Sequence, residues 1–190
     1  MTDPAVIERS MTLDGFLAFL EERPTGERWE LDDGTPVMNP LPTRRHDWIQ
    51  TNILLALRIH RRSHQSPWRP AGPSQVPVPG RNRTVAPDVL VAPEAERDDV
   101  SITPDPIVVF EVLSRSDTRA RRARKQDDYE AITSIRHYVV VRQDRREVVA
   151  YRRAADGRFA IDPAGDTIEL TAIGATLTIA EIYAETLLAE

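Results

Sequence analysis

A single glutamate interrupts the most apolar stretch of the chain. Residues 107–113 read Ile-Val-Val-Phe-Glu-Val-Leu, and this β-branched, apolar run predicts a strand buried on both faces of a sheet. A carboxylate inside such a strand costs several kcal/mol, on the order of the penalty for an unpaired buried ion, unless a cation or a metal ion meets it. Glu111 therefore predicts a functional site inside the protein.

A second carboxylate, Asp88, repeats the pattern. It lies within the apolar run Val-Ala-Pro-Asp-Val-Leu-Val at 85–91, which we expect to belong to one strand over 83–92. Two neighbouring strands that present carboxylates at their ends would make a site of hard oxygen ligands suited to Mg²⁺ or Mn²⁺. For either carboxylate alone, an arginine partner is the better explanation, whereas the two together favour the metal site.

The chain has 25 basic residues, and Lys125 is the one lysine among them. It lies about two turns into a helix that we expect to end near Ile132, so its side chain can reach back to the carboxylates. Tyr129, four residues further, shares its face. An ammonium in this place can orient or deprotonate an attacking water, or stabilise charge on a phosphate. The alternative is a solvent-facing lysine on a basic helix.

The pattern of elements predicts an α/β protein, in which helices flank a mixed sheet and a β-rich meander follows towards the C-terminus. The length of 190 residues suits one domain over 1–190. The expected helices are 12–22, one that begins at Thr43 or His46, one that ends near Ile132 and one that begins at Thr178; the expected strands are 29–31, 35–38, 75–78, 83–92, 107–113, 137–141, 147–152, 158–161 and 167–170.

Composition excludes some chemistry. The chain has no cysteine, which rules out disulfides, thiolate-bound zinc and a cysteine nucleophile. It has no apolar run long enough to span a membrane, and its start, Met1-Thr2-Asp3-Pro4, lacks the basic character of a signal peptide, so we expect a cytoplasmic protein with no membrane partner. The net charge of −5 does not favour nucleic-acid binding, but basic residues cluster at 58–62 and at 115–125. These clusters, which include Arg121, can contact phosphates or can be solvated helix faces.

These residues resemble a known group, the bacterial putative restriction endonuclease family within the PD-(D/E)XK nuclease superfamily. The resemblance covers roughly 12–153, and the segments that carry it are Trp29 to Gly34, His46, Pro87-Asp88, Glu111 to Ser114, Lys125, Tyr129 and His137 to Val141. In the superfamily, the lysine normally lies two residues after the second carboxylate. Leu113 occupies that position here, and the family instead places its lysine on the following helix, where Lys125 lies.

The resemblance implies a restriction-endonuclease-like fold and a Mg²⁺-dependent (or Mn²⁺-dependent) endonuclease that cuts DNA. Asp88, Glu111 and the Val112 carbonyl would hold the ion. Glu30 would bind it through water or hold a second ion, and Lys125 would position the attacking water. Cleavage of both strands needs two sites, so we expect a homodimer.

Four further residues are candidates for contacts with the substrate. His46 would contact a phosphate or the rim of the site, or would simply cap its helix. Gln75, expected on the strand beside Asp88, Arg121 on the basic helix and Tyr129 complete the set.

Two other functions remain open. A module that binds nucleic acid or a protein on the same fold, without turnover, is consistent with the acidic net charge. A serine hydrolase built on Ser114 has little support, because the chain has no Gly-x-Ser-x-Gly elbow and a serine before a helix is explained as a turn residue.

Overall fold

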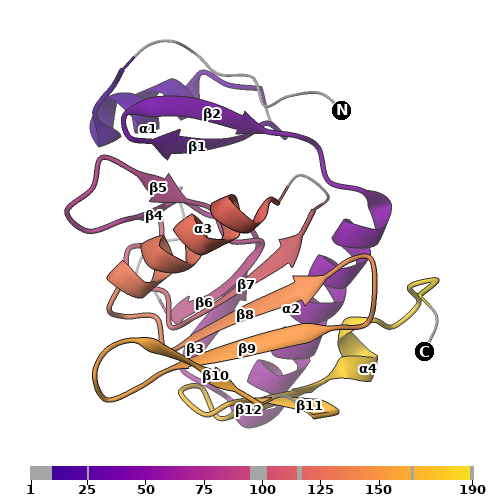
Figure 1. Ribbon diagram of the computed structural model, residues 1–190. Coiled ribbons are helices and arrows are strands. Elements are labelled where there is room, and N and C mark those ends of the chain that lie inside the picture. The colour runs from indigo at the N-terminus through magenta and orange to yellow at the C-terminus, as the bar shows by residue number, and fades with distance from the viewer. Residues whose placement is uncertain (1–9, 25, 95–101, 115–116, 164, 189–190) are drawn as a thin grey trace.

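The centre of the protein is a six-stranded mixed sheet (Figure 1). The structure, a computed structural model, describes residues 10–24, 26–94, 102–114, 117–163 and 165–188, so the acidic start of the chain lies outside it. Across the sheet the strands are β10 (Phe159–Asp162), β9 (Val148–Arg153), β8 (His137–Arg142), β7 (Val108–Leu113), β6 (Val89–Pro93) and β3 (Trp68–Ala71). Only β7 and β8 are parallel neighbours in this sheet. The predicted α/β class with a mixed sheet and a β-rich C-terminal part is confirmed.

Helices cover both faces of the sheet. Helix α2 (Arg44–His64) packs against one face, and α3 (Arg119–Ala131), which joins β7 to β8, lies over the other (Figure 1). Because successive side chains of a strand point to opposite faces, Phe110 packs in the core beneath α2 while Glu111 faces α3. The strand that predicted a functional site therefore presents its carboxylate to the helix that carries the lysine.

The remaining elements form small units on this frame. They are α1 (Leu13–Glu21), the hairpin of β1 (Arg28–Asp32) and β2 (Thr35–Asn39), the pair of β4 (Val76–Pro77) and β5 (Thr84–Val85), the hairpin of β11 (Thr167–Leu170) and β12 (Ala175–Thr178), and α4 (Ile179–Ile182).

A buried arginine fastens the β1–β2 hairpin to α3. Arg83, 8% exposed, contacts Asp32 at 3.0 Å, Asp33 at 2.7 Å and Asp128 of α3 at 3.1 Å. Arg124 of α3 also contacts Asp32 and Asp33. A charge as buried as Arg83 is tolerated only when it is paired, and here its three partners come from two elements. This network fixes β1 beside α3.

The predicted strand over 83–92 is wrong in one respect, because it is two strands. Pro87 has no N–H to donate to a ladder, and the chain breaks there into β5 and β6. Asp88 lies in the break, and its N–H donates to the Phe110 carbonyl at 3.0 Å. The predicted place of Gln75 is also wrong, since it precedes β4, which pairs with β5 and not with β6.

Two other strands escaped the sequence pattern. β3 lies in the proline-rich segment that we expected to hold only an edge strand at 75–78, and its Pro70 is tolerated because β3 forms the edge of the sheet. β12 was not expected. Because it pairs with β11, the 167–170 strand does not extend the meander beyond β10.

A buried histidine links β8 to the turn between β11 and β12. His137 is 1% exposed, and its Nε2 accepts the Ala172 N–H at 3.3 Å. Burial lowers its pKa below the usual 6.5, which keeps the ring neutral. The unfolded chain therefore takes up the proton first, and His137 costs stability as the pH falls below about 6.5.

We expect His137→Gln to be about 1 kcal/mol less stable than wild type at pH 8, from the lost hydrogen bond. The gap should narrow or reverse at pH 5, because glutamine does not titrate. Urea unfolding at both pH values tests this expectation. His60, whose pKa burial also lowers, contributes equally to both proteins. A gap that widens at pH 5 contradicts the assignment.

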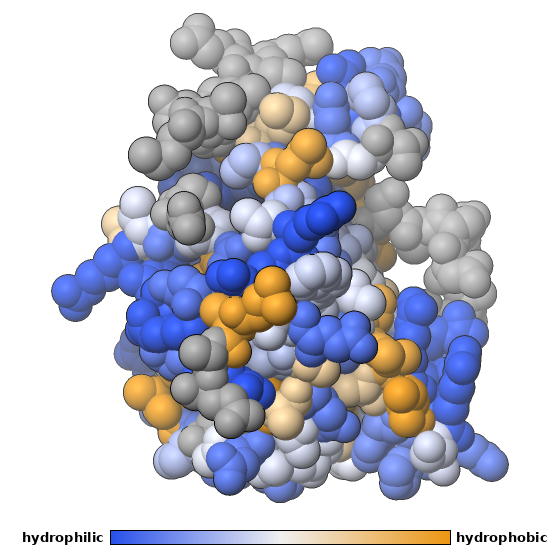
Figure 2. All heavy atoms as spheres, turned by 90° about the vertical axis from the view of Figure 1, so that its right-hand side faces the viewer, coloured by the Kyte–Doolittle hydropathy of each residue, from blue (hydrophilic) through white to orange (hydrophobic). Residues whose placement is uncertain are grey.

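Two expectations concern the surface, the absence of a membrane partner and the homodimer. In the part of the chain that the structure describes, no helix is both long and apolar enough to cross a membrane. On the side where α2 begins and α4 lies, the apolar side chains form small, separate patches between polar ones (Figure 2). The expected homodimer stays a prediction.

Candidate active site

Four predicted residues meet in one cluster, which we call the carboxylate cluster: Glu30, Asp88, Glu111 and Lys125. Glu30 comes from β1, Asp88 from the break before β6, Glu111 from β7 and Lys125 from α3. The antiparallel register pairs Val89 with Phe110, which sets Asp88 and Glu111 at the same end of two neighbouring strands. Each of the three carboxylates is at most 9% exposed. The expectation that strand ends and the following helix bring these groups together agrees with the geometry.

Lys125 is the cation of the cluster. Its Nζ lies 3.0 Å from both oxygens of Glu111 and 3.5 Å from Oε1 of Glu30. Burial alone lowers the pKa of Lys125, but the charges of Glu111, Glu30 and Asp88 outweigh burial and raise the pKa above its usual value. The side chain is therefore a permanent ammonium at neutral pH.

Glu111 is the one of the three carboxylates whose pKa is raised above its usual value. Burial raises its pKa, the neighbouring charges of Asp88 and Glu30 add to the effect, and Lys125 and Tyr129 oppose it; the resulting pKa is about 7. The Tyr129 hydroxyl donates a hydrogen bond to Oε1 of Glu111. A negative charge this close to two others is stabilised by any further cation that enters the cluster.

Asp88 is held ionised by three donors. Its Oδ2 accepts the Val112 N–H at 2.8 Å and lies 3.3 Å from Nε2 of His46, and its Oδ1 accepts from Nη2 of Arg28 at 2.6 Å. Burial raises the pKa of Asp88, but His46 and Arg28 outweigh it and lower the pKa to about 2. Asp88 is a carboxylate at every pH at which the protein is expected to work.

Glu30 is the carboxylate that β1 contributes to the cluster. Its Oε1 accepts the Ala86 N–H at 3.2 Å. Burial raises its pKa, and the charges of Lys125 and Arg121, with a hydrogen bond from Asn39, reverse the direction and lower it. Arg121 lies 3.9 Å from Oε2 of Glu30 and donates to Oδ1 of Asn39 at 2.5 Å. With 29% of its side chain exposed, Arg121 stands at the rim, where a substrate can reach it.

The other predicted contact residues turn inwards. His46 is 4% exposed and points at Asp88, so it supports that carboxylate from the first turns of α2. Tyr129 is fully buried behind Glu111, and Val112 contributes its amide to Asp88. We correct our expectation that Tyr129 contacts the substrate: it orients Glu111.

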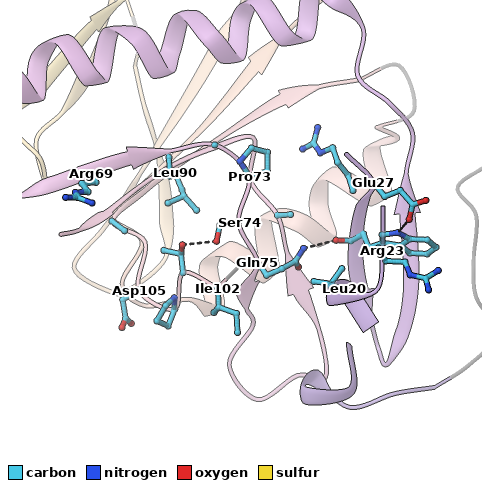
Figure 3. Close-up of a pocket in the computed structure, with 18 of the residues that line it drawn as sticks. Leu20, Arg23, Glu27, Arg69, Pro73, Ser74, Gln75, Leu90, Ile102 and Asp105 are labelled. Carbon is cyan, nitrogen blue, oxygen red and sulfur yellow. Dashed lines mark hydrogen bonds between the residues drawn. The ribbon is translucent and has the colours of Figure 1, made fainter. Parts of the chain in front are cut away.

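Gln75 lies away from the carboxylates, beside a large cavity of about 1090 Å³ (Figure 3). Its Nε2 donates to the Trp29 carbonyl at 2.8 Å, the contact drawn in Figure 3, and its Oε1 accepts from the Thr84 hydroxyl at 2.7 Å. Both ends of the amide are therefore used within the fold. The two hydrogen bonds of Gln75 hold β1 beside β5, and neither of them goes to Asp88.

Sequence reasoning missed Arg28. It begins β1, binds Asp88 at 2.6 Å and lines the cavity of Figure 3. Burial alone lowers the pKa of Arg28, but the charges of Asp88, Glu111 and Glu30 outweigh burial and raise it. The alternation Arg-Trp-Glu-Leu in β1 carries a weak signal, since Arg28 and Glu30 share one face of a strand. Nothing in the sequence indicates that this face meets Asp88.

The donor set suits a hard divalent cation. The cluster combines three carboxylates with Arg28 and Lys125 in direct contact and Arg121 at 3.9 Å, and carboxylate oxygens are the ligands that hard divalent cations prefer. Nδ1 of His46 and Nε of Arg28 are buried without a hydrogen-bond partner among the described residues, although Nδ1 of His46 lies 3.9 Å from Oδ1 of Asp47. In that same part of the chain, no three acidic or histidine side chains stand in a ready arrangement for an ion. An ion bound here would share the carboxylate oxygens that Lys125 and Arg28 now contact.

Comparison with known proteins agrees with this description. A family model described as Uma2, putative restriction endonuclease, matches residues 13–180. The crystal structure of a putative nuclease belonging to DUF820 from Anabaena variabilis superposes with a TM-score of 0.70 and 17% sequence identity, over 92% of this chain and 98% of that one. At this identity the superposition shows a shared fold. No curated protein matches the chain.

Proposed function

The chain belongs to the Uma2 family of putative restriction endonucleases, and from this premise we propose that it is a Mg²⁺-dependent endonuclease that hydrolyses phosphodiester bonds in DNA. Family membership supports a nuclease-like role. One observation carries the finer proposal: Lys125 lies 3.0 Å from both oxygens of Glu111 within a buried cluster that also contains Asp88 and Glu30.

The residues that would hold the ion are Asp88, Glu111 and the carbonyl of Val112, with Glu30 bound through water or to a second ion. When bound, the ion would polarise the scissile phosphate and lower the pKa of the attacking water. Asp88 suits this role because its pKa of about 2 keeps it ionised. Tyr129 would keep Glu111 in orientation from behind.

Lys125 would act as a fixed positive charge. Its raised pKa argues against a general base and favours the two other roles of an ammonium, which are to orient the water and to stabilise charge on the phosphate. Arg28 would release Asp88 when the ion binds and would then face the substrate phosphate as a second cation.

The test is incubation of the purified protein with supercoiled plasmid DNA and Mg²⁺ or Mn²⁺. We expect nicked and linear products, and none with EDTA. Lys125→Met should lower the rate by about 10²-fold or more, on the scale of a lost electrostatic donor. Equal cleavage by wild type and by Lys125→Met would overturn the proposed function.

A second candidate is a DNA-binding module without turnover. It is favoured by the internal pairing of the cluster, in which Arg28 and His46 already compensate Asp88 and Lys125 compensates Glu111. This candidate predicts salt-sensitive binding that EDTA does not change, with no strand cleavage at any metal concentration.

Tyr129→Phe separates support of Glu111 from general packing. We expect cleavage about ten-fold or more slower, since partners of metal-binding carboxylates typically matter to this extent, and a loss of about 1 kcal/mol of stability. Tyr183→Phe is the matched control, because its buried hydroxyl binds the backbone of Arg142 and Glu147 outside the cluster. Equal cleavage by the two variants contradicts the role given to Tyr129.

A further inference from the structure

A second cavity, of about 410 Å³, lies between α3 and the two neighbouring strands β8 and β9. In Figure 1, α3 runs in front of the sheet, and β8 and β9 lie below it in the view. We call this cavity the arginine groove. Its polar and apolar walls include Arg119, Arg122 and Gln126 of α3, Val140 and Arg142 of β8 and Tyr151 of β9.

Of the three arginines that line the groove, one has an acidic partner among the described residues. Among the residues that the structure describes, the side chains of Arg119 and Arg122 make no ion pair or hydrogen bond, and Nε of Arg122 is buried without an acceptor. Arg142 is fixed by Asp144, with two contacts of 2.8 Å. One carboxylate, Glu147, lines the same cavity, and it is already bound to Arg145. The groove therefore has an excess of positive charge.

The start of α3 also breaks a general rule of helices. α1, α2 and α4 each carry an acidic residue in the first turn, as the helix dipole favours, whereas α3 carries none. Arg119, Arg121 and Arg122 stand there instead. Cations at a helix N-terminus are unfavourable, and an anion bound at that end makes their presence there favourable.

The groove adjoins the carboxylate cluster. Arg122 lies three residues before Lys125 on α3, which is about 4.5 Å along the helix axis. Leu113, two residues after Glu111 on β7, also lines the cavity. A strand whose scissile phosphate contacts Lys125 would therefore bring its neighbouring phosphates to the groove.

We propose that the arginine groove binds backbone phosphates of the DNA strand beside the cleaved bond, through Arg119 and Arg122. This inference rests on the proposed function, because it makes the groove part of the path of the same substrate. The apolar floor of Val140, Val149 and Tyr151 would contact the sugars.

The test is binding of a fluorescent duplex oligonucleotide, measured by anisotropy in EDTA over a series of salt concentrations. The double variant Arg119→Gln/Arg122→Gln is compared with Arg58→Gln/Arg62→Gln, which removes the same two charges from α2 on the opposite face of the sheet. We expect the slope of log affinity against log salt to fall by about 1.8 for the α3 variant, at 0.9 per phosphate contact, and to change little for the control.

Three results overturn the inference: equal losses in the two double variants, no loss in either, or no binding of DNA by the wild-type protein. The inference is also overturned if polyglutamate displaces the labelled duplex as well as unlabelled DNA does at the same concentration of charges. The groove would then select an acidic protein.

The same variants separate this inference from the proposed function. With Mg²⁺ present, the α3 variant should raise KM more than it lowers kcat. If the protein binds DNA through the groove but never cleaves it, the proposed function is wrong and the proposal for the groove stands. If the α3 variant cleaves DNA with unchanged KM and an unchanged salt slope, the proposal for the groove is wrong and the proposed function stands.

Discussion

Asp88→Asn is expected to reduce DNA cleavage by about 10³-fold or more and to leave DNA binding in EDTA within a few-fold of wild type. The change keeps the size of the side chain but removes the charge that an ion and Arg28 share. Loss of one carboxylate ligand costs about 4 kcal/mol of transition-state stabilisation, and each 1.36 kcal/mol is tenfold in rate. Single-turnover cleavage of a plasmid with Mg²⁺ measures the effect.

The matched control for this change is Asp162→Asn. Asp162 ends β10 and lies 3.7 Å from Arg152, so the substitution also removes one carboxylate from an ion pair, but at the far edge of the sheet. We expect it to leave the rate unchanged. Full activity of Asp88→Asn would show that the cluster is not the catalytic centre.

Glu111→Gln is expected to abolish cleavage and yet to stabilise the metal-free protein at pH 8. The folded pKa of Glu111, about 7, lies above the unfolded value of 4.5, so wild type loses stability as the pH rises through this window and regains none above it. A shift of this size corresponds to roughly 3 kcal/mol, taken as an upper figure. Glutamine carries no charge, and Lys125 keeps Glu30 as its partner at 3.5 Å.

Urea unfolding of metal-free protein at pH 5 and pH 8 tests this prediction. The stability of Glu111→Gln relative to wild type should rise from pH 5 to pH 8, because His137 and His60 contribute equally to both proteins. Glu169→Gln, an exposed change on β11, should follow wild type at both pH values. Mg²⁺ should then raise the unfolding temperature of wild type and not that of Glu111→Gln. A Glu111→Gln protein that is less stable than wild type at pH 8 contradicts the electrostatic account of the cluster.

The sequence contained the core of the site because its signal is local. A charge in a buried strand is conspicuous, and Glu111 and Asp88 both stand out against apolar neighbours. Lys125 could be added because helical periodicity places it two turns into α3, on the face of Tyr129. Both expectations need only short-range pattern and the rule that charge is not buried unpaired.

The remainder depends on contacts between distant segments. Arg28 reaches Asp88 across 60 positions of sequence, and nothing near either residue reports that meeting. Gln75 was misplaced because a two-residue pair, β4 and β5, has too little pattern to distinguish it from the main sheet. β3 was hidden for a similar reason, since prolines normally count against a strand and only its place at the sheet edge admits them.

The pairing within the cluster explains how three carboxylates are tolerated in the interior before any ion arrives. Lys125 contacts two of them and Arg28 contacts the third, so the protein can fold before a metal ion binds. On the proposed function, these two cations then become the groups that meet the negative substrate. Lys125 and Arg28 would thus stabilise the protein in the absence of an ion and would contact the substrate during the reaction.

The most direct test of this account is a crystal structure of the protein soaked in Mn²⁺, with anomalous diffraction recorded for manganese. The account predicts an anomalous peak bound to Asp88 and Glu111, with Arg28 moved off Asp88 and Lys125 still within the cluster. An anomalous map with no peak at these two carboxylates, in crystals whose Arg28–Asp88 and Lys125–Glu111 pairs are unchanged, would contradict it.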